Sequence, residues 1–194
     1  AAGKPVEIIR IQELGGTSRA IQAGIDAAQR LVQEISGLQR ETVDISEVVM
    51  AIKCGASDTT SGMASNCVIG YVADKLVDLG ATVVFGETTE FLGGEHILAK
   101  RAVGGENGPI GQKIYEIVDR MEKRAKSVGE DMRGGQPTPG NIAGGLSSIE
   151  EKSLGAIVKS GHRPIQGVLE YCDRVDGLKG LWIKDAPGRE PEIL

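Results

Sequence analysis

The sequence has few aromatic residues, few cysteines and no long hydrophobic run. Aromatic side chains make up 3% of the 194 residues and the net charge is −5, so the chain offers little to stack on bases and no basic face for nucleic acid. Its three cysteines, Cys54, Cys67 and Cys172, are widely spaced and predict neither a disulfide framework nor a paired-cysteine zinc site. No stretch approaches the roughly 20 apolar residues that a membrane-spanning helix needs. We therefore expect a cytoplasmic protein that binds neither nucleic acid nor membrane.

The start of the chain lacks both a signal-peptide pattern and an initiator methionine. We interpret it as a processed chain or as a piece of a longer one. Its 194 residues suit one α/β domain, or one domain with part of another. Neither a Walker loop nor a Gly-x-Gly-x-x-G motif is present, which disfavours nucleotide binding.

Strand-like apolar runs alternate with amphipathic helical runs along the sequence. Strands are predicted at 6–12, 48–54, 81–86, 168–175 and 180–184, and helices at 17–36, 65–79, 97–102, 109–127 and from 147 onward. The run at 48–54 is typical of a strand buried on both faces. Alternation of this kind indicates right-handed crossovers and parallel strands. The predicted fold class is α/β, three-layer and Rossmann-like, with a mainly parallel sheet flanked by helices.

A polar boundary near residues 38–42 divides the sequence. We interpret residues 1–40 as a strand–helix unit, the tail of a preceding domain, with Thr17 as the helix N-cap. Residues 41–194 are predicted to form the main α/β domain, truncated at its C-terminus. In the later part of the chain, residues 134–145 are rich in glycine and proline and predict a long loop, and Ser147 begins a capping box.

A polar loop at residues 53–62 follows the second predicted strand. It offers hydroxyls, a carboxylate and backbone N–H groups ahead of a helix, a combination that binds carboxylate or phosphate. An ordinary capped turn between strand and helix explains the same residues equally well. Cys54 in this loop is a candidate nucleophile or iron ligand, although a cysteine at a strand end is more often simply buried.

A second polar loop, residues 86–96, also leaves a strand end, which is where ligands bind in open α/β sheets. It concentrates Glu87, Glu90, Glu95 and His96, a group that suits a hard divalent metal or acid–base catalysis. The alternative is that Glu95 and His96 only occupy the first turn of a helix. A third polar loop, residues 136–145, has no clear strand of origin.

Three segments together resemble the carboxy-terminal region of the altronate/galactarate dehydratase family. Residues 53–58 (Lys-Cys-Gly-Ala-Ser-Asp), with Ser61-Gly62 and Asn66, are similar to its Cys-Gly-Gly-Ser-Asp…Ser-Gly…Asn signature. Residues 87–96 resemble its Glu-x-x-Glu-x-x-Gly-Ala-Glu-His segment, and residues 139–155 its Pro-Gly-Asn…Gly-Gly-Leu…Glu-Lys-Ser-Leu-Gly run. The resemblance covers about residues 43–188. Two positions depart from the pattern, with Ala56 in place of glycine and Gly94 in place of alanine.

The resemblance implies a lyase that dehydrates a hydroxy-acid such as altronate or galactarate. It also implies a divalent metal, Fe²⁺ first, with Mn²⁺ or Mg²⁺ as alternatives. The same superfamily includes sulfolactate sulfo-lyase, which eliminates sulfite, so the large subunit of that enzyme is one alternative and a noncatalytic scaffold or binding domain is another. The small amino-terminal domain of the family is not in the sequence, so we expect the isolated chain to be a fragment that is inactive alone. Missing domains or a small partner subunit are expected, as is a homo-oligomer.

For this function we assign residues by their chemistry and their place in the motifs. Catalysis is assigned to Glu87, Glu90 and His96, and metal binding to Glu95 and His96. Contact with the substrate is assigned to Cys54, Ser57, Asp58, Ser61 and Asn141.

Overall fold

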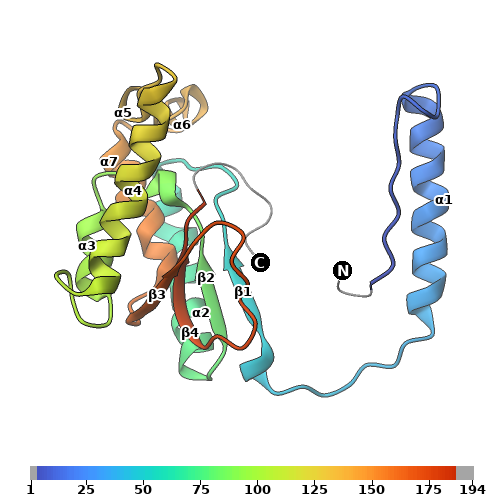
Figure 1. Cartoon of the computed structure of the whole chain (residues 1–194), viewed down its shortest axis with the longest axis horizontal. Helices are drawn as coiled ribbons and strands as arrows, with labels where there is room; N and C mark the ends of the chain where they lie inside the picture. The colour runs from blue at the N-terminus through green and yellow to red at the C-terminus, as the bar shows by residue number, and fades with distance from the viewer. Residues whose placement is uncertain (1–3, 187–194) are drawn as a thin grey trace. The chain divides into compact units, whose positions relative to one another are not determined.

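The structure, a computed structural model, describes residues 4–186 of the chain. These fall into two compact units that meet in the sequence between Val43 and Asp44, and each unit is described by itself (Figure 1). The carboxyl end of the predicted main domain, residues 187–194, lies outside the described residues. None of the described helices is long and apolar enough to cross a membrane.

The first unit consists of an extended segment followed by helix α1 (Thr17–Ser36). The predicted strand at 6–12 is wrong: the described part of this unit holds no strand to pair with, and the segment lies beside α1, where Glu7 pairs with Arg30 at 3.0 Å. Thr17 is not the N-cap, because Gly16 takes that position and no side chain caps the helix. The end of the helix at Ser36 agrees with the prediction.

The second unit contains a four-stranded sheet in which every strand is parallel to its neighbours. Its strands are β1 (Val49–Ile52), β2 (Thr82–Phe85), β3 (Ile165–Leu169) and β4 (Gly180–Lys184), in the order β1-β2-β4-β3. The arrangement confirms the α/β class with a parallel sheet and agrees with the expected three-layer, Rossmann-like fold. The third strand begins earlier and ends earlier than the predicted 168–175.

The two neighbouring strands β1 and β2 differ sharply in burial. All four residues of β2 are buried, as a central strand requires. β1 lies at the edge of the sheet, where Val49 is 38% exposed and only Ile52 is buried. The prediction that this run is buried on both faces is therefore wrong for the described residues.

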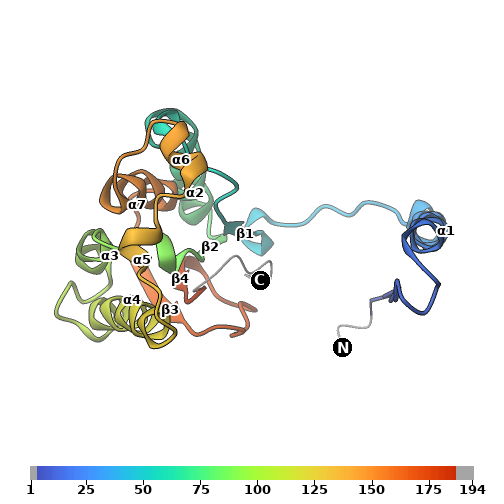
Figure 2. The ribbon, with the colours of Figure 1, turned by 90° about the horizontal axis from the view of Figure 1, so that it is seen from above.

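Helices cover the sheet and enclose the core. α2 (Asn66–Asp78) packs on β2 and β4, α4 (Pro109–Ser127) packs on β3, and α3 (Glu95–Arg101) lies alongside α4 (Figures 1 and 2). α7 (Ile149–Ile157) begins at the N-cap Ser148, one residue after the predicted Ser147, because the Ser148 side chain accepts from the N–H of Glu151. The shared core contains Ile52, Val83, Phe85, Leu98, Ile114, Ile117, Leu181 and Ile183.

Short helical turns occupy several of the predicted loops. α5 (Met132–Gly135) and α6 (Pro139–Ala143) lie in and beside the predicted loop at 134–145, since Asp131 and Thr138 cap them. A π-helical turn at Ser61–Ser65 leads directly into α2. Single 3-10 turns are found at Ile45–Glu47, Thr88–Glu90 and Val158–Ser160. The carboxyl ends of the strands point toward α5 and α6, at the top of Figure 1.

Glycines let two helical segments approach closely. A Cβ on Gly62 would lie 2.9 Å from the Cα of Gly155, and a Cβ on Gly70 would lie 2.2 Å from the carbonyl oxygen of Val158. Real Cβ contacts are longer than 3.0 Å, so both positions require glycine in this arrangement. The close contact holds α7 and the turn after it against the segment that follows β1.

Candidate active site

Side chains from the ends of β1 and β2 meet at the carboxyl edge of the sheet. Ile52 and Phe85 are register partners, so Cys54 and Glu87 each stand two residues beyond a paired position. Glu90 follows one helical turn later, in the 3-10 turn Thr88–Glu90. One ligand atom from each of Cys54, Glu87 and Glu90 lies within 4.8 Å of the other two. The parallel sheet therefore brings together two of the polar loops that the sequence predicts to lie at strand ends.

Two buried lysines complete this cluster. Lys159 Nζ lies 2.5 Å from Glu87 Oε2 and 3.6 Å from Glu90 Oε2. Lys152 Nζ lies 3.4 Å from Glu90 Oε1 and donates a hydrogen bond of 2.8 Å to Gln136 Oε1. Both lysines and both glutamates are less than one-tenth exposed. The cluster thus holds two carboxyl and two ammonium groups away from water, where charges interact strongly.

Burial and neighbouring charges separate the ionisation of the two glutamates. Burial, together with the adjacent Glu90, raises the pKa of Glu87 to about 8. Burial also acts to raise the pKa of Glu90, but the nearby Lys159 and Lys152 outweigh it and hold that pKa below its ordinary value. Glu90 is therefore the carboxylate of the pair and Glu87 the group that retains a proton more readily. Burial raises the pKa of the Cys54 thiol, which leaves it a weak nucleophile on its own.

A cavity of about 220 Å³ opens beside Glu90. Residues from all three polar segments line it, together with one residue of α5 and one of α7: Lys53, Cys54, Gly55, Ala56, Thr89, Glu90, Met132, Gln136, Asn141 and Lys152. Glu87 is not among them and is fully buried. The carboxylate that faces the cavity is therefore that of Glu90.

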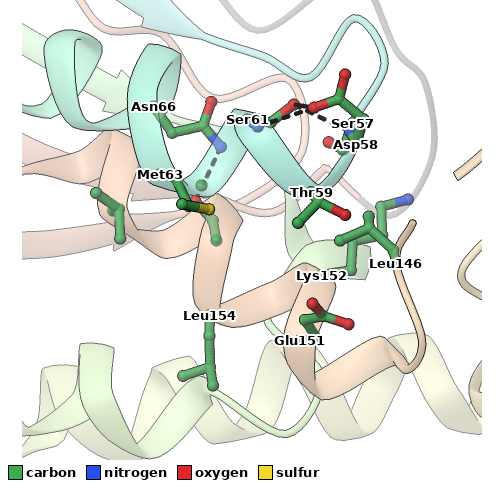
Figure 3. Close-up of a pocket in the computed structure, with 13 residues that line it drawn as sticks. Ser57, Asp58, Thr59, Ser61, Met63, Asn66, Leu146, Glu151, Lys152 and Leu154 are labelled. Carbon is green, nitrogen blue, oxygen red and sulfur yellow. Dashed lines mark hydrogen bonds between the residues drawn. The ribbon is translucent and has the colours of Figure 1, made fainter. Parts of the chain in front are cut away.

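A second cavity, of about 260 Å³, is also lined by Lys152 (Figure 3). Ser57, Asp58 and Ser61 line it, with Asn66 and the more apolar Met63, Leu146 and Leu154. Asp58 Oδ1 accepts hydrogen bonds from the N–H groups of Thr60 and Ser61, at 2.8 and 3.0 Å. The hydroxyl of Thr60, which also donates to Oδ1, lowers the pKa of Asp58 most, and the hydroxyl of Ser61 and the two N–H groups lower it further. The side chain thus caps the turn at the start of the helix.

The third polar segment joins the first through Asn141. Its Nδ2 donates to the carbonyl oxygen of Ser57 at 2.8 Å, and the N–H of Thr59 donates to the carbonyl oxygen of Gly144 at 3.0 Å. Asn141 also accepts from the N–H and the hydroxyl of Thr138 at the start of α6. In this structure Asn141 links two loops as well as lining the first cavity.

The structure does not bring every predicted site residue into the cluster. Glu95 and His96 stand on the first turn of α3, where His96 is exposed. Glu95 lies near Tyr115 and Arg133, with which it interacts electrostatically. Among the described residues, the group of potential metal ligands is Cys54, Glu87 and Glu90, and it includes neither Glu95 nor His96.

Sequence reasoning missed Lys152 and Lys159. A lysine on an amphipathic helix ordinarily faces water, so neither residue stood out by type. A signal exists for Lys152, which follows the apolar Ile149 by three residues and precedes Ala156 by four, and thus lies on the buried face of α7. Lys159 lies beyond the end of α7, in a turn whose burial arises only from the packing against α2.

The cluster fits a divalent metal through atoms that lack hydrogen bonds. Glu87 Oε1 and Glu90 Oε2 are buried and accept no hydrogen bond from the described residues. One thiol and two carboxylates form a donor set that suits Fe²⁺ or Mn²⁺; Mg²⁺, which prefers oxygen ligands alone, suits the thiol less well. A metal in this cluster would bind the same carboxyl groups, those of Glu87 and Glu90, that lie beside the two lysines.

The fold and the cluster define an α/β domain with buried carboxyl and ammonium groups at the carboxyl edge of a parallel sheet. The model of the family described as D-galactarate/altronate dehydratase, C-terminal, matches residues 45–194. The chain therefore belongs to this family and represents its C-terminal region.

Individual relatives agree with the family match. The chain is 42% identical, over 195 residues, to the (2R)-sulfolactate sulfo-lyase subunit beta of Chromohalobacter salexigens, with 100% of the chain and 49% of the relative covered. It is 38% identical over 159 residues to the galactarate dehydratase (L-threo-forming) of Escherichia coli, covering 82% of the chain and 30% of the relative. It is 33% identical over 186 residues to the altronate dehydratase of Bacillus subtilis, and this match covers 94% of the chain and 36% of the relative. The chain spans half or less of the length of these relatives.

Proposed function

We propose that this chain forms part of a metal-assisted lyase that removes water from a hydroxy-acid such as galactarate or altronate. The observation that carries the proposal is the Glu90 carboxylate on the wall of a 220 Å³ polar cavity, next to Cys54 and Lys152. Substrates of this kind need a base, a site for a carboxylate and donors for hydroxyl groups. The names of the dehydratase relatives support the choice of substrate class.

The reaction begins with removal of the proton on the carbon next to the substrate carboxylate. Glu90 acts as the base, because it is the ionised carboxylate that reaches the cavity. The electron pair of the broken C–H bond moves into the carboxyl group to give an enolate, and then forms a double bond to the neighbouring carbon and expels hydroxide from it. The proton that was removed and the hydroxide that departs together account for the water released. Asn141, Gln136 and Thr89 line the same cavity and can orient the hydroxyl groups.

A metal bound in this cluster would act as a Lewis acid toward a substrate oxygen. Cys54, Glu87 and Glu90 would hold it, and the two carboxyl oxygens without hydrogen bonds support this assignment. The expectation that Glu95 and His96 bind the metal would require ligands from elsewhere in the assembled protein. Fe²⁺ remains our first choice, with Mn²⁺ next and Mg²⁺ last.

Completion of the site by other parts of the protein belongs to the same proposal. The relatives are about two to three times as long as the chain, and one of them carries the name of a subunit beta. Further domains or a partner subunit are therefore expected to cover the cavities, and we retain the homo-oligomer as the expected assembly.

The alternative is a sulfolactate sulfo-lyase subunit. The observation that favours it is the 42% identity to such a subunit over the whole chain. The chemistry differs only in the leaving group, since sulfite in place of hydroxide departs from the carbon next to the enolate. The same base and the same cavity would serve both reactions.

The experiment is a turnover assay of the intact protein against galactarate, altronate and sulfolactate. Release of water from a sugar acid supports the proposal, release of sulfite supports the alternative, and turnover of none of the three contradicts both. Glu90→Gln is expected to lower kcat by about 10²- to 10⁴-fold, the usual worth of a general base. Glu130→Gln, at an exposed position, is the matched control and should leave kcat unchanged.

Metal content tests the metal assignment separately. The intact protein is purified with Fe²⁺, Mn²⁺ or Mg²⁺ and its bound metal is measured by elemental analysis. Cys54→Ala and Glu90→Gln are each expected to reduce the bound metal, whereas His96→Ala should reduce it only if the residue contributes to the site in the assembled protein. Unchanged metal in both cluster variants would place the metal elsewhere.

A further inference from the structure

We propose that Lys152 binds the carboxylate of the substrate and stabilises the negative charge that develops on it during proton removal. The proposal rests on the function proposed above and names a residue that the sequence analysis assigned no role. Lys152 would be a catalytic residue, because its ammonium group would touch the reacting part of the substrate.

Lys152 is a buried cation that lies at the wall of two cavities. Its side chain is 7% exposed and lines both the 220 Å³ and the 260 Å³ cavities. Figure 3 shows it at the rim of the second cavity, close to Leu146. Few lysines are so deeply buried unless an anion compensates them.

The contacts of Lys152 leave room for a further anion. An ammonium group has three N–H donors. One N–H donates to Gln136 Oε1 at 2.8 Å. A second is directed toward Glu90 Oε1, which lies 3.4 Å from Nζ. A substrate carboxylate can accept from the third, on the side where the ammonium meets the cavities.

The distance between Lys152 and Glu90 then places the base beside the carbon that reacts. The carbon that loses its proton is bonded directly to the carboxylate carbon. A carboxylate bound to Lys152 Nζ therefore brings this carbon close to Glu90, whose Oε1 lies 3.4 Å from the same Nζ. Binding and proton removal are coupled through one ammonium group.

Lys152 would also stabilise the negative charge that develops when the proton is removed. When the C–H bond breaks, its proton passes to Glu90 and its electron pair moves toward the carboxyl group. The carboxylate then carries nearly two negative charges, and a fixed cation beside it is worth more in this state than in the ground state. The pair returns to expel the leaving group, and the extra charge departs with it.

The other cations nearby are less suited to this role. Lys159 lines neither cavity and lies 2.5 Å from the buried Glu87. Lys53 also lines the first cavity, from the segment that leaves β1. Lys53→Met is therefore the informative comparison.

The experiment measures binding without turnover. Galactarate, altronate and sulfolactate are titrated by calorimetry into the intact protein carrying Glu90→Gln, alone and combined with Lys152→Met, Lys53→Met or Lys123→Met. Lys123 is exposed on α4 and serves as the matched control. Loss of a charge-assisted hydrogen bond predicts about 10- to 100-fold weaker binding for Lys152→Met, a smaller change for Lys53→Met and none for Lys123→Met. A Lys152 variant that binds as tightly as its parent overturns the proposal, as does a larger loss in Lys53→Met.

A change in the ligand gives a second test that does not depend on the folding of the Lys152 variant. The amide of the same acid removes the charge while keeping the shape, and it should bind the Glu90→Gln protein about 10- to 100-fold less tightly than the acid does. Equal binding of acid and amide contradicts the proposal even if Lys152→Met fails to fold. If the wild-type protein turns over none of the three acids and binds none, the proposed function has failed. If it turns one over while Lys152→Met leaves binding intact, only the role of Lys152 has failed.

Discussion

Lys159 Nζ lies 2.5 Å from Glu87 Oε2, and neither side chain has more than 3% of its surface exposed. The pair is buried behind the cavity and does not line it. Glu90 stands between this pair and Lys152, with 3.6 Å to one ammonium and 3.4 Å to the other. Lys159 and Glu87 thus form a buried pair that lies against Glu90, the carboxyl group that faces the cavity.

Removal of Lys159 should destabilise the protein more than removal of the whole pair. Lys159→Met leaves a carboxyl group buried next to Glu90 without its cation, and losses of about 3–5 kcal/mol are usual for one half of a buried pair. Lys159→Met combined with Glu87→Gln should recover much of that loss, since the group that needs a cation is gone. Thermal unfolding of the intact protein checks both variants. Equal midpoints for the single and the double variant would contradict this prediction.

The sequence predicts those residues of the site whose position depends on a single strand and its end. Cys54, Glu87 and Glu90 follow buried or partly buried strands, and the rule that ligands bind beyond the carboxyl ends of parallel strands predicts their neighbourhood. The alternating pattern likewise predicts the parallel sheet and the bounds of α4 and β4. Local patterning carries these predictions because each depends on only one element and its end.

The remaining features depend on packing between distant segments. Val68 and Val72 are apolar residues of α2, yet they are 64% and 41% exposed. The apolar stripe of that helix is wider than the surface that covers it here. Lys152 and Lys159 show the opposite case, because their burial depends on packing between distant segments. α7 packs on the turns at Ser61–Ser65 and Thr88–Glu90, and the turn after α7 packs on α2. Hydropathy alone identifies neither.

The close contact between Gly62 and Gly155 should be intolerant of a methyl group. Gly62→Ala places a Cβ 2.9 Å from the Cα of Gly155, and the obstacle is backbone, which cannot rotate away. We expect a loss of about 1–3 kcal/mol, together with lower turnover, because α7 carries Lys152. Gly135→Ala is the matched control, since a Cβ there meets nothing within 4 Å. The thermal midpoint measures the difference, and equal midpoints in the two variants would contradict the contact.

Gly94, where the family pattern has alanine, should tolerate that alanine once Ile157 is shortened. A Cβ at position 94 would lie 2.5 Å from Ile157 Cδ1, the end of a flexible side chain. Gly94→Ala alone is expected to cost about 1 kcal/mol as an overpacked contact. Ile157→Val alone removes a buried methylene and is expected to cost about 0.5–1.5 kcal/mol. The double variant should lose less stability than the sum of the two single losses. Strictly additive losses in thermal unfolding would rule out the clash.

Asp74 should support stability at neutral pH and lose that effect in acid. Burial acts to raise its pKa, but hydrogen bonds from the N–H groups of His162 and Arg163, from the His162 ring and the charge of Arg163 hold the pKa below its ordinary value. The unfolded chain therefore takes up the proton first as the pH falls. The contribution of Asp74 is complete above the ordinary aspartate pKa of about 3.9 and disappears as the pH falls through the lower folded value.

Asp74→Asn separates this titration from the hydrogen bonds themselves. The asparagine keeps an oxygen that can accept from His162 and Arg163 but carries no charge at any pH. Its thermal midpoint should lie below that of the wild type at pH 7, and the gap should narrow as the pH falls below the ordinary aspartate pKa of about 3.9. A gap of constant size across this range would mean that the charge of Asp74 adds nothing to stability.

Met63 and Leu154 line the second cavity and are 76% and 50% exposed. Their side chains carry none of the hydrogen bonds that fix the loops, and Figure 3 shows both beside the Asn66 side of that cavity. Replacement at these two positions can therefore reshape one end of the site while the carboxylate chemistry at the other end stays intact. Under the proposed function, a library of replacements confined to this pair is expected to yield variants that accept acids with longer or less polar tails.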